Sequence, residues 1–135
     1  MTERMTQQGF ESYLWGAAVI LRGLVDAGDY KQFVFPLLFY KRLSDVWDED
    51  YAVALAETKD MTYARATADD RFVVPDGSHW NDVRGVAKDV GRTLQDALRA
   101  IEAANPGRLD GIFGDAQWTN KERLPDSTLK NLFEH

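Results

Sequence analysis

The sequence predicts an all-α domain, a compact bundle of about four to five helices with an irregular middle segment. Apolar residues recur at helical spacing over residues 8–22 and 82–104. Residues 29–51 gather large apolar side chains and a basic pair into about six helical turns. Because 135 residues correspond to one ordinary domain, we expect residues 1–135 to form a single helical domain.

The first predicted helix runs from about Gln8 to Arg22. Four apolar residues at spacings of four, three and four fall on one side of it and predict its buried face. Gly23 and the turn residues 26–28 predict its end. The four residues of this stripe are Phe10, Leu14, Ala17 and Leu21.

The second predicted helix begins at Asp29, whose carboxylate can accept from the free amides of the first turn. Pro36 removes one hydrogen bond, so the helix either kinks there or restarts with Pro36 in its first turn. Beyond the proline, the segment is apolar on more than half of its circumference. This pattern predicts the central, most buried element, with Leu37, Leu38, Phe39, Leu43, Val46 and Trp47.

Helical periodicity is lost over residues 58–81, where turn-forming residues accumulate and a short extended piece at residues 72–74 is expected. It returns over residues 82–104. The Asn105-Pro106-Gly107 sequence predicts the end of that helix, because proline disfavours a helical residue before it and glycine permits the turn. The apolar stripe of this helix is Val83, Val86, Val90, Leu94, Ala97, Leu98 and Ile101.

A loop over residues 108–124 follows, with a short turn expected at residues 109–113. Residues 127–135 have the pattern of an amphipathic helix that stops without a glycine, a proline or a charged tail. We therefore expect this domain to have been cut from a longer protein.

Composition favours a globular protein of a reducing compartment. The chain has no cysteine, which removes disulfides and thiolate metal sites. Its N-terminus lacks the apolar region of a signal peptide, and no stretch approaches eighteen apolar residues. We expect a cytoplasmic protein with no membrane segment.

The net charge of −6 argues against strong DNA binding by the domain alone, because phosphate binding normally needs a basic excess. Residues 43–82 hold ten acidic and three basic residues, a net charge of −7, and the rest of the chain has a net charge of +1. A DNA-facing surface is therefore expected outside residues 43–82.

A basic stripe follows the predicted helix 82–104. At about 100° per residue, its members fall within an arc of roughly 80°, opposite the apolar stripe. One interpretation is contact with a phosphate backbone or an acidic partner helix. The other is a solvated face, in which the stripe pairs with Asp89 and Asp96 at spacings of three and four residues. The stripe consists of Arg84, Lys88, Arg92, Gln95 and Arg99.

Lys41 and Arg42 form a second basic candidate. They either extend out of a buried helix and pair with Asp45 or Asp48, or project to meet nucleic acid or another subunit. The acidic residues 45–50 do not predict a metal site, because consecutive acids on a helix point in different directions.

The remaining candidates are weaker still. A histidine at His79 with neither cysteine nor a second nearby histidine does not predict zinc or catalysis. The four tryptophans, Trp15, Trp47, Trp80 and Trp118, are expected to anchor the core rather than to stack on bases. No active site is expected.

Three stretches in order along the chain carry a resemblance to a known family. They are Phe-Glu-Ser-Tyr-Leu-Trp-Gly-Ala-Ala at 10–18, Phe-Pro-Leu-Leu-Phe-Tyr-Lys-Arg-Leu-Ser-Asp at 35–45, and Ile-Phe-Gly-Asp-Ala-Gln-Trp-Thr-Asn at 112–120. The chain resembles the N-terminal helical domain of the methylation (M) subunit of type I restriction-modification systems. The resemblance spans nearly the whole chain.

The resemblance implies a parent that transfers methyl from S-adenosylmethionine to adenine N6 in double-stranded DNA. A specificity subunit and a restriction subunit would be its partners. The catalytic half of the family needs a glycine-rich turn after a strand and an Asn/Asp-Pro-Pro-Tyr/Phe loop for the flipped adenine. All four prolines here are isolated, so we expect neither catalysis nor a cofactor in this chain. The alternative function is a free-standing helical adaptor for a protein partner, unrelated to DNA.

Overall fold

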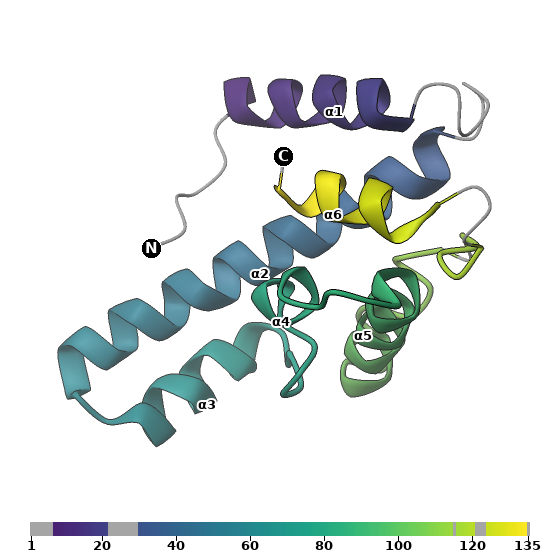
Figure 1. The fold of residues 1–135 in the computed structure, drawn as a ribbon. Coiled ribbons are helices and arrows are strands. Elements are labelled where there is room, and N and C mark those ends of the chain that lie inside the picture. Colours follow the sequence, from purple (N-terminus) through teal and green to yellow (C-terminus); the bar gives the residue numbers. More distant parts are fainter. Residues whose placement is uncertain (1–6, 22–29, 115, 121–123, 135) are drawn as a thin grey trace.

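The computed structural model describes residues 7–21, 30–114, 116–120 and 124–134. They form six helices and no strand, which confirms the predicted all-α class (Figure 1). None of these helices has the length and apolar character needed to cross a membrane. The helices are α1 (Gln7–Leu21), α2 (Tyr30–Thr58), α3 (Met61–Arg71), α4 (Trp80–Arg84), α5 (Val90–Ala104) and α6 (Asp126–Glu134).

Helix α2 is the axis of the fold. It continues through Pro36, which excludes the restart, one of the two alternatives that the proline left open. The expected cap at Asp29 lies outside the described residues. One side of α2 is buried, but Phe39, one of the apolar residues of the segment predicted to be most buried, is 47% exposed. The buried side of α2 includes Phe33, Val34, Leu37, Leu38, Tyr40, Leu43 and Trp47.

The core lies between α1, α2, α4, α5 and α6 and contains several aromatic pairs. Trp118 meets Phe33 edge to face, with ring centroids 5.3 Å apart. Trp80 lies between Tyr40 at 5.2 Å and Phe133 at 4.4 Å. Three of the four tryptophans are buried as predicted, whereas Trp15 is 70% exposed on α1, so its predicted core role is wrong.

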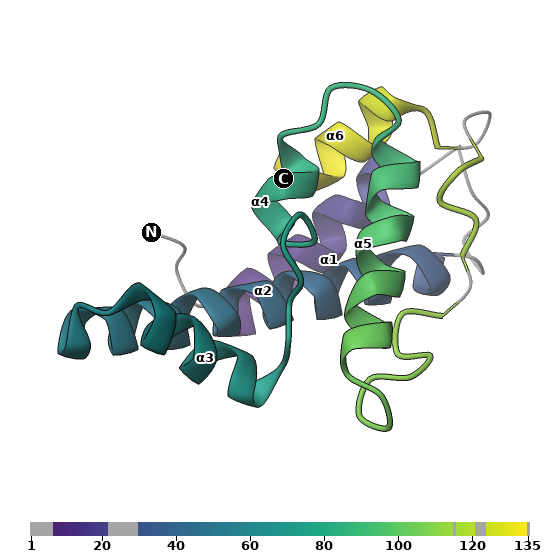
Figure 2. The ribbon, with the colours of Figure 1, turned by 90° about the horizontal axis from the view of Figure 1, so that it is seen from below.

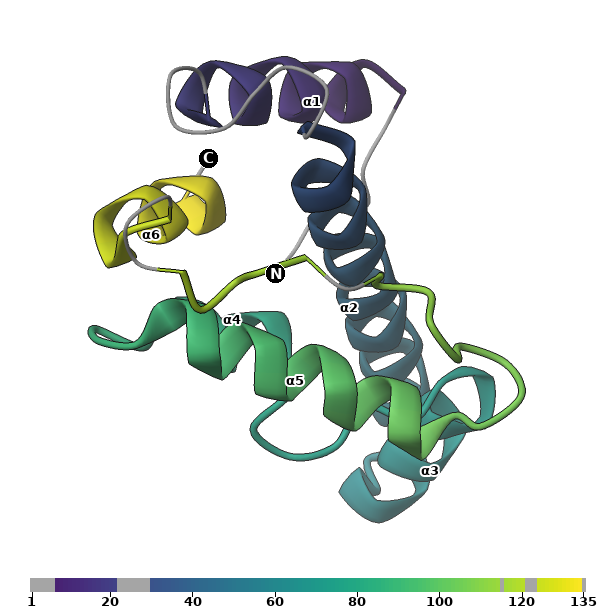
Figure 3. The same cartoon turned by 90° about the vertical axis from the view of Figure 1, so that its right-hand side faces the viewer.

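Helix α1 is present, and two of the four residues of its predicted stripe can be placed. Ala17 and Leu21 are fully buried, and the side chains of Phe10 and Leu14 lie outside the described residues. The predicted end at Gly23 and residues 26–28 is also outside them, although α1 is described to Leu21. Figures 2 and 3 show α1 crossing the N-terminal part of α2, and α1 also contacts α6.

The prediction of an irregular segment over residues 58–81 is wrong for α3. Asp60 caps this helix by accepting from the amides of Thr62 at 3.0 Å and Tyr63 at 3.2 Å. Its buried face consists of two alanines, Ala64 and Ala68. These small residues let α3 approach α2 closely. They form no stripe of large apolar residues that could be recognised in the sequence.

Residues 82–104 form two helices rather than the one predicted. The chain leaves α4 after Arg84, and Asp89 adopts a left-handed conformation, with φ of 53°, before α5 begins. The Asp126 carboxylate accepts from the backbone amides of Asp89 at 3.2 Å and Val90 at 3.1 Å. It thereby gives hydrogen-bond partners to amides at the start of α5 that have none within the helix. Because this cap lies 36 residues away in the sequence, the local spacing of residues cannot predict it.

The predictions for the C-terminal third are largely confirmed. Helix α5 ends at Ala104 with Asn105 as its C-cap, and Gly107 has φ of 77°, as the Asn-Pro-Gly sequence predicts. The turn at residues 109–113 is present, with the Ile112 amide donating to the Leu109 carbonyl at 3.2 Å.

In the middle of the chain, the predicted extended piece is present at Phe72, which has φ of −147° and ψ of 131°, although no strand forms among the described residues.

Candidate functional site

The four cations of the predicted stripe do not share one helical face. Arg84 lies on α4, Lys88 in the connection between α4 and α5, and Arg92 and Arg99 on α5. The break at residues 85–89 therefore removes the continuous stripe that the sequence predicted. Each cation has to be assessed by its own contacts.

Lys41 is bound within the domain. Its Nζ lies 3.0 Å from Asp45 Oδ1, four residues along α2, and 5.6 Å from the centre of the Trp80 ring. The predicted pairing with Asp45 is thereby confirmed. Arg42, in contrast, is exposed on α2 and makes no ion pair with another described residue.

Arg84 joins α4 to the end of α6. Its Nε and Nη2 donate to the two carboxylate oxygens of Glu134 at 2.9 and 2.8 Å. This hydrogen bonding raises the pKa of Arg84 and lowers the pKa of Glu134. The Lys130 ammonium also donates to the Arg84 carbonyl. The guanidinium is thus paired within the domain.

Arg99 holds the loop that follows α5. Its guanidinium donates to Glu102 Oε1 at 2.5 Å and to the Gly114 carbonyl at 2.5 Å. The second oxygen of Glu102 accepts from the Phe113 amide at 3.3 Å. The predicted pairing of Arg99 with Asp96 is wrong, because Arg99 points toward the loop and Glu102 instead.

The structure therefore separates the six candidates into two groups. Lys41, Arg84 and Arg99 are engaged inside the domain. The other three are exposed, and none forms an ion pair within the described part of the chain; we name them the free cations, and they are Arg42, Lys88 and Arg92.

A groove of about 460 Å³ lies at the start of α5, beside Arg92. Arg92 is the one base of its lining against three acids, so a phosphate inside the groove would meet carboxylates as well as the guanidinium. Phosphate contact by Arg92 would have to occur at the mouth. The lining residues are Asp89, Gly91, Arg92, Gln95, Asp96, Trp118, Thr119, Leu124 and Asp126.

The acidic segment of α2 is divided among separate contacts. Asp45 pairs with Lys41, and Asp50 Oδ2 lies 3.2 Å from Arg71 Nε. Nowhere in the described ranges do three or more histidine or carboxylate side chains gather as metal ligands would. The ring of His79 packs edge to face on Trp47, with centroids 4.6 Å apart, so His79 is a packing residue at the start of α4.

Ionised Asp48 destabilises the fold at neutral pH, and a substitution can reveal this effect. Burial raises the pKa of Asp48, the nearby Asp45 adds to the rise, and His79 and Lys41 oppose it. A carboxyl with a raised folded pKa stabilises the fold below its unfolded pKa and loses that contribution as the pH rises through the folded pKa. Asp48→Asn should therefore stabilise the domain slightly at pH 7, by less than about 1 kcal/mol, and the gain should vanish near pH 3.

Urea unfolding of both proteins at pH 7 and pH 3 measures this difference. Glu49→Gln, an exposed neighbour on α2, serves as the charge-matched control. A gain that is as large at pH 3 as at pH 7 would contradict the electrostatic explanation.

Together, the helices and the exposed cations define a small all-helical domain with charged surface residues. Comparison with protein families makes the assignment specific, since the family described as HsdM N-terminal domain matches residues 10–135. The chain belongs to this family, the N-terminal domain of the methylation subunit of type I restriction-modification DNA methyltransferases. No curated protein matches the chain significantly.

Proposed function

We propose that this chain is the DNA-clasping and subunit-docking module of a type I restriction-modification adenine-specific DNA methyltransferase. Family membership over residues 10–135 is the observation that carries the proposal. In this proposal the parent transfers methyl from S-adenosylmethionine to adenine N6, and a specificity subunit selects the sequence. A restriction subunit completes the complex.

The proposal assigns the chemistry to other parts of the parent. A methyl donor of this type is held at a glycine-rich turn that follows a strand, and the described residues are helices joined by loops and turns. We therefore place the donor in the rest of the parent. What this chain contributes is a rigid helical support and exposed charge.

The three free cations are the residues that we assign to DNA in the assembled enzyme. An arginine that already shares two hydrogen bonds with a carboxylate, such as Arg84, must give them up before it binds phosphate. An exposed and unpaired cation has no such cost. The assignment therefore falls on Arg42, Lys88 and Arg92 rather than on all six predicted residues.

Exposed apolar residues support the docking part of the proposal. Trp15 and Val19 lie four residues apart on α1, and Phe35 and Phe39 lie four residues apart on α2, all at least 41% exposed. Residues spaced by four share a helix face, so each helix presents an apolar pair to its surroundings. Such pairs suit a protein neighbour, which is also what the adaptor alternative requires.

Salt dependence of DNA binding tests the proposal. Each phosphate contact contributes about 0.9 to the slope of log affinity against log salt, because it releases counterions. The Arg42→Gln/Lys88→Gln/Arg92→Gln variant of the assembled enzyme should lose about two units of slope or more. The Arg84→Gln/Arg99→Gln variant is the control and should keep the slope within about half a unit. An unchanged slope in the triple variant would refute the assignment to DNA.

A further inference from the structure

Helix α3 and the C-terminal part of α2 form a projecting hairpin, residues 47–71. Figures 1 and 2 show α3 running back along α2, away from α1, α5 and α6. Trp47 Nε1 donates to Asp69 at 2.8 Å and ties the base of the hairpin. Two grooves of this hairpin are each lined by residues of both α2 and α3.

The first of these grooves is shallow and has a volume of about 320 Å³. Its α2 residues are spaced at i, i+3, i+4 and i+7, and its α3 residues at i, i+4, i+7 and i+8, so each helix contributes one face. Val53 and Tyr63 are each 55% exposed along it. The lining residues are Asp50, Val53, Ala54, Glu57, Tyr63, Thr67, Asp70 and Arg71.

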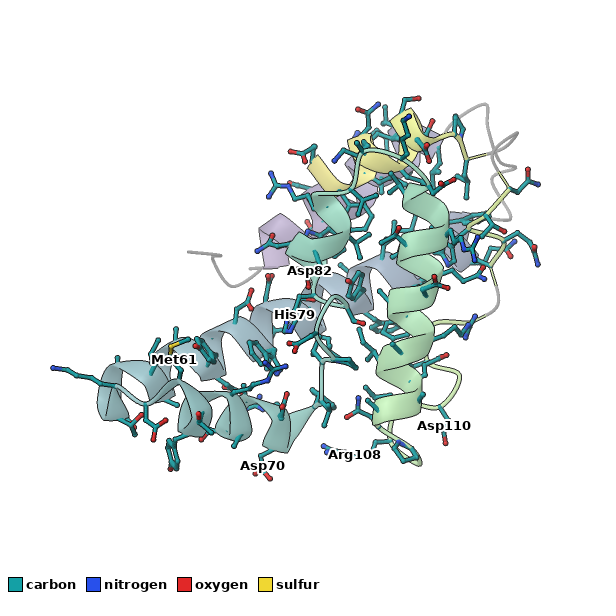
Figure 4. All side chains as sticks on the ribbon, turned by 60° about the horizontal axis from the view of Figure 1, so that its bottom comes forward. Met61, Asp70, His79, Asp82, Arg108 and Asp110 are labelled. Atoms are coloured by element: carbon teal, nitrogen blue, oxygen red, sulfur yellow. The ribbon has the colours of Figure 1, made fainter. Side chains whose placement is uncertain are left out.

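The charges of this groove are negative and partly unpaired. Arg71 is paired with Asp50, which leaves Glu57 and Asp70 exposed beside the apolar residues. The groove lining carries three acids and one base, a net charge of −2, and the hairpin as a whole carries seven acids and three bases, a net charge of −4. Figure 4 shows Asp70 on the side of the hairpin opposite Met61, so the acidic groove and the Met61 side are separate surfaces.

We propose that this groove binds a basic amphipathic segment of a partner protein. Aliphatic side chains of the segment would cover Val53 and Tyr63, and its lysines or arginines would pair with Glu57 and Asp70 at the rim. Burial of exposed apolar surface would supply affinity, and opposite charge would select the partner. The inference goes beyond the proposed function, because it concerns a surface to which that function assigns no DNA contact.

The other occupants fit the groove poorly. Nucleic acid phosphates would be repelled by a net charge of −4 on the hairpin. The same groove of a second copy would bring like charges together. A segment that is basic but lacks apolar residues would leave Val53 and Tyr63 uncovered.

Binding of synthetic peptides to the whole chain, followed by fluorescence anisotropy, tests the inference. The probe is an 18-residue helical peptide with a leucine face flanked by lysines. Two comparison peptides replace the lysines by glutamates or the leucines by serines. We expect measurable binding of the Leu/Lys peptide, and binding at least about tenfold weaker for each comparison peptide.

Two charge-matched double variants locate the site. Glu57→Gln/Asp70→Asn should weaken binding of the Leu/Lys peptide about threefold to tenfold, as should Val53→Ser. Glu11→Gln/Asp96→Asn removes the same charge from exposed positions on α1 and α5 and should change affinity less than twofold. Circular dichroism establishes that each variant is folded.

Any of three results overturns the inference. The first is equal binding of the Lys and Glu peptides, and the second is equal weakening of peptide binding by the two double variants. The third is a chain that binds no peptide but self-associates, with the self-association lost in Val53→Ser; a second copy would then be the occupant. The Glu57→Gln/Asp70→Asn variant should keep the salt slope of DNA binding by the assembled enzyme. Failure here therefore leaves the proposed function intact, and failure of the salt test leaves this inference intact.

Discussion

Replacing Gly91 by alanine should destabilise the domain by at least about 3 kcal/mol. A Cβ at this position would lie 1.9 Å from the Trp118 carbonyl oxygen and 2.9 Å from its carbonyl carbon. These are backbone atoms, so no side-chain rotation relieves the clash. Trp118 is itself buried against Phe33, and moving it would open the core. Helix α5 and the segment around Trp118 would have to separate.

Chemical unfolding of the two proteins measures this loss, and Gly85→Ala provides the matched control. Gly85 has φ of −76°, and the nearest atom to a Cβ there is the Asn81 carbonyl oxygen at 3.4 Å, an ordinary contact. The control should therefore lie within about 0.5 kcal/mol of the parent. If Gly91→Ala were as mild as Gly85→Ala, the packing of α5 on Trp118 described above would be wrong.

Asn105→Ala should cost about 2–4 kcal/mol. The Asn105 side chain accepts from the Val73 amide at 2.8 Å and donates to the carbonyls of Val73 and Ile101, each at 2.8 Å. It thus acts as the partner that a second strand would provide for the extended chain at Val73. Because Asn105 is buried and its bonds to Val73 are partly buried, alanine would leave these backbone groups without their side-chain partner.

The loss can be measured by urea unfolding and compared with Asn131→Ala, an exposed asparagine on α6 that should change stability by about 0.5 kcal/mol or less. Hydrogen exchange adds a local measurement, since the Val73 amide should exchange faster in Asn105→Ala only. Equal stability of the two variants would show that the three hydrogen bonds contribute little.

Helices whose buried faces carry large side chains could be predicted from sequence. The stripe through Leu94, Leu98 and Ile101 predicts α5, and all three residues are fully or nearly fully buried. Helix α3 was missed because Ala64 and Ala68 form its buried face, and alanines do not distinguish a buried from an exposed surface in a sequence. The start of α5 was missed because its cap, Asp126, is distant in sequence.

The basic candidates divide in the same way between local and distant partners. Lys41 and Asp45 are four residues apart on one helix, so their pairing could be predicted. Arg84 and Glu134 are 50 residues apart, and only the fold brings them together. Arg99 had acids within reach on both sides, and the position of the Gly114 carbonyl accounts for the choice of Glu102.

A single-turnover methylation assay of the assembled enzyme tests the central claim, that this chain holds DNA and other subunits and leaves methyl transfer to the rest of the parent. With Arg42→Glu/Lys88→Glu/Arg92→Glu, the dissociation constant for DNA should rise about tenfold or more. The methylation rate at saturating DNA should stay within about twofold of the parent. A saturating rate that falls by a hundredfold with an unchanged dissociation constant would place these residues in the chemical step and contradict the account.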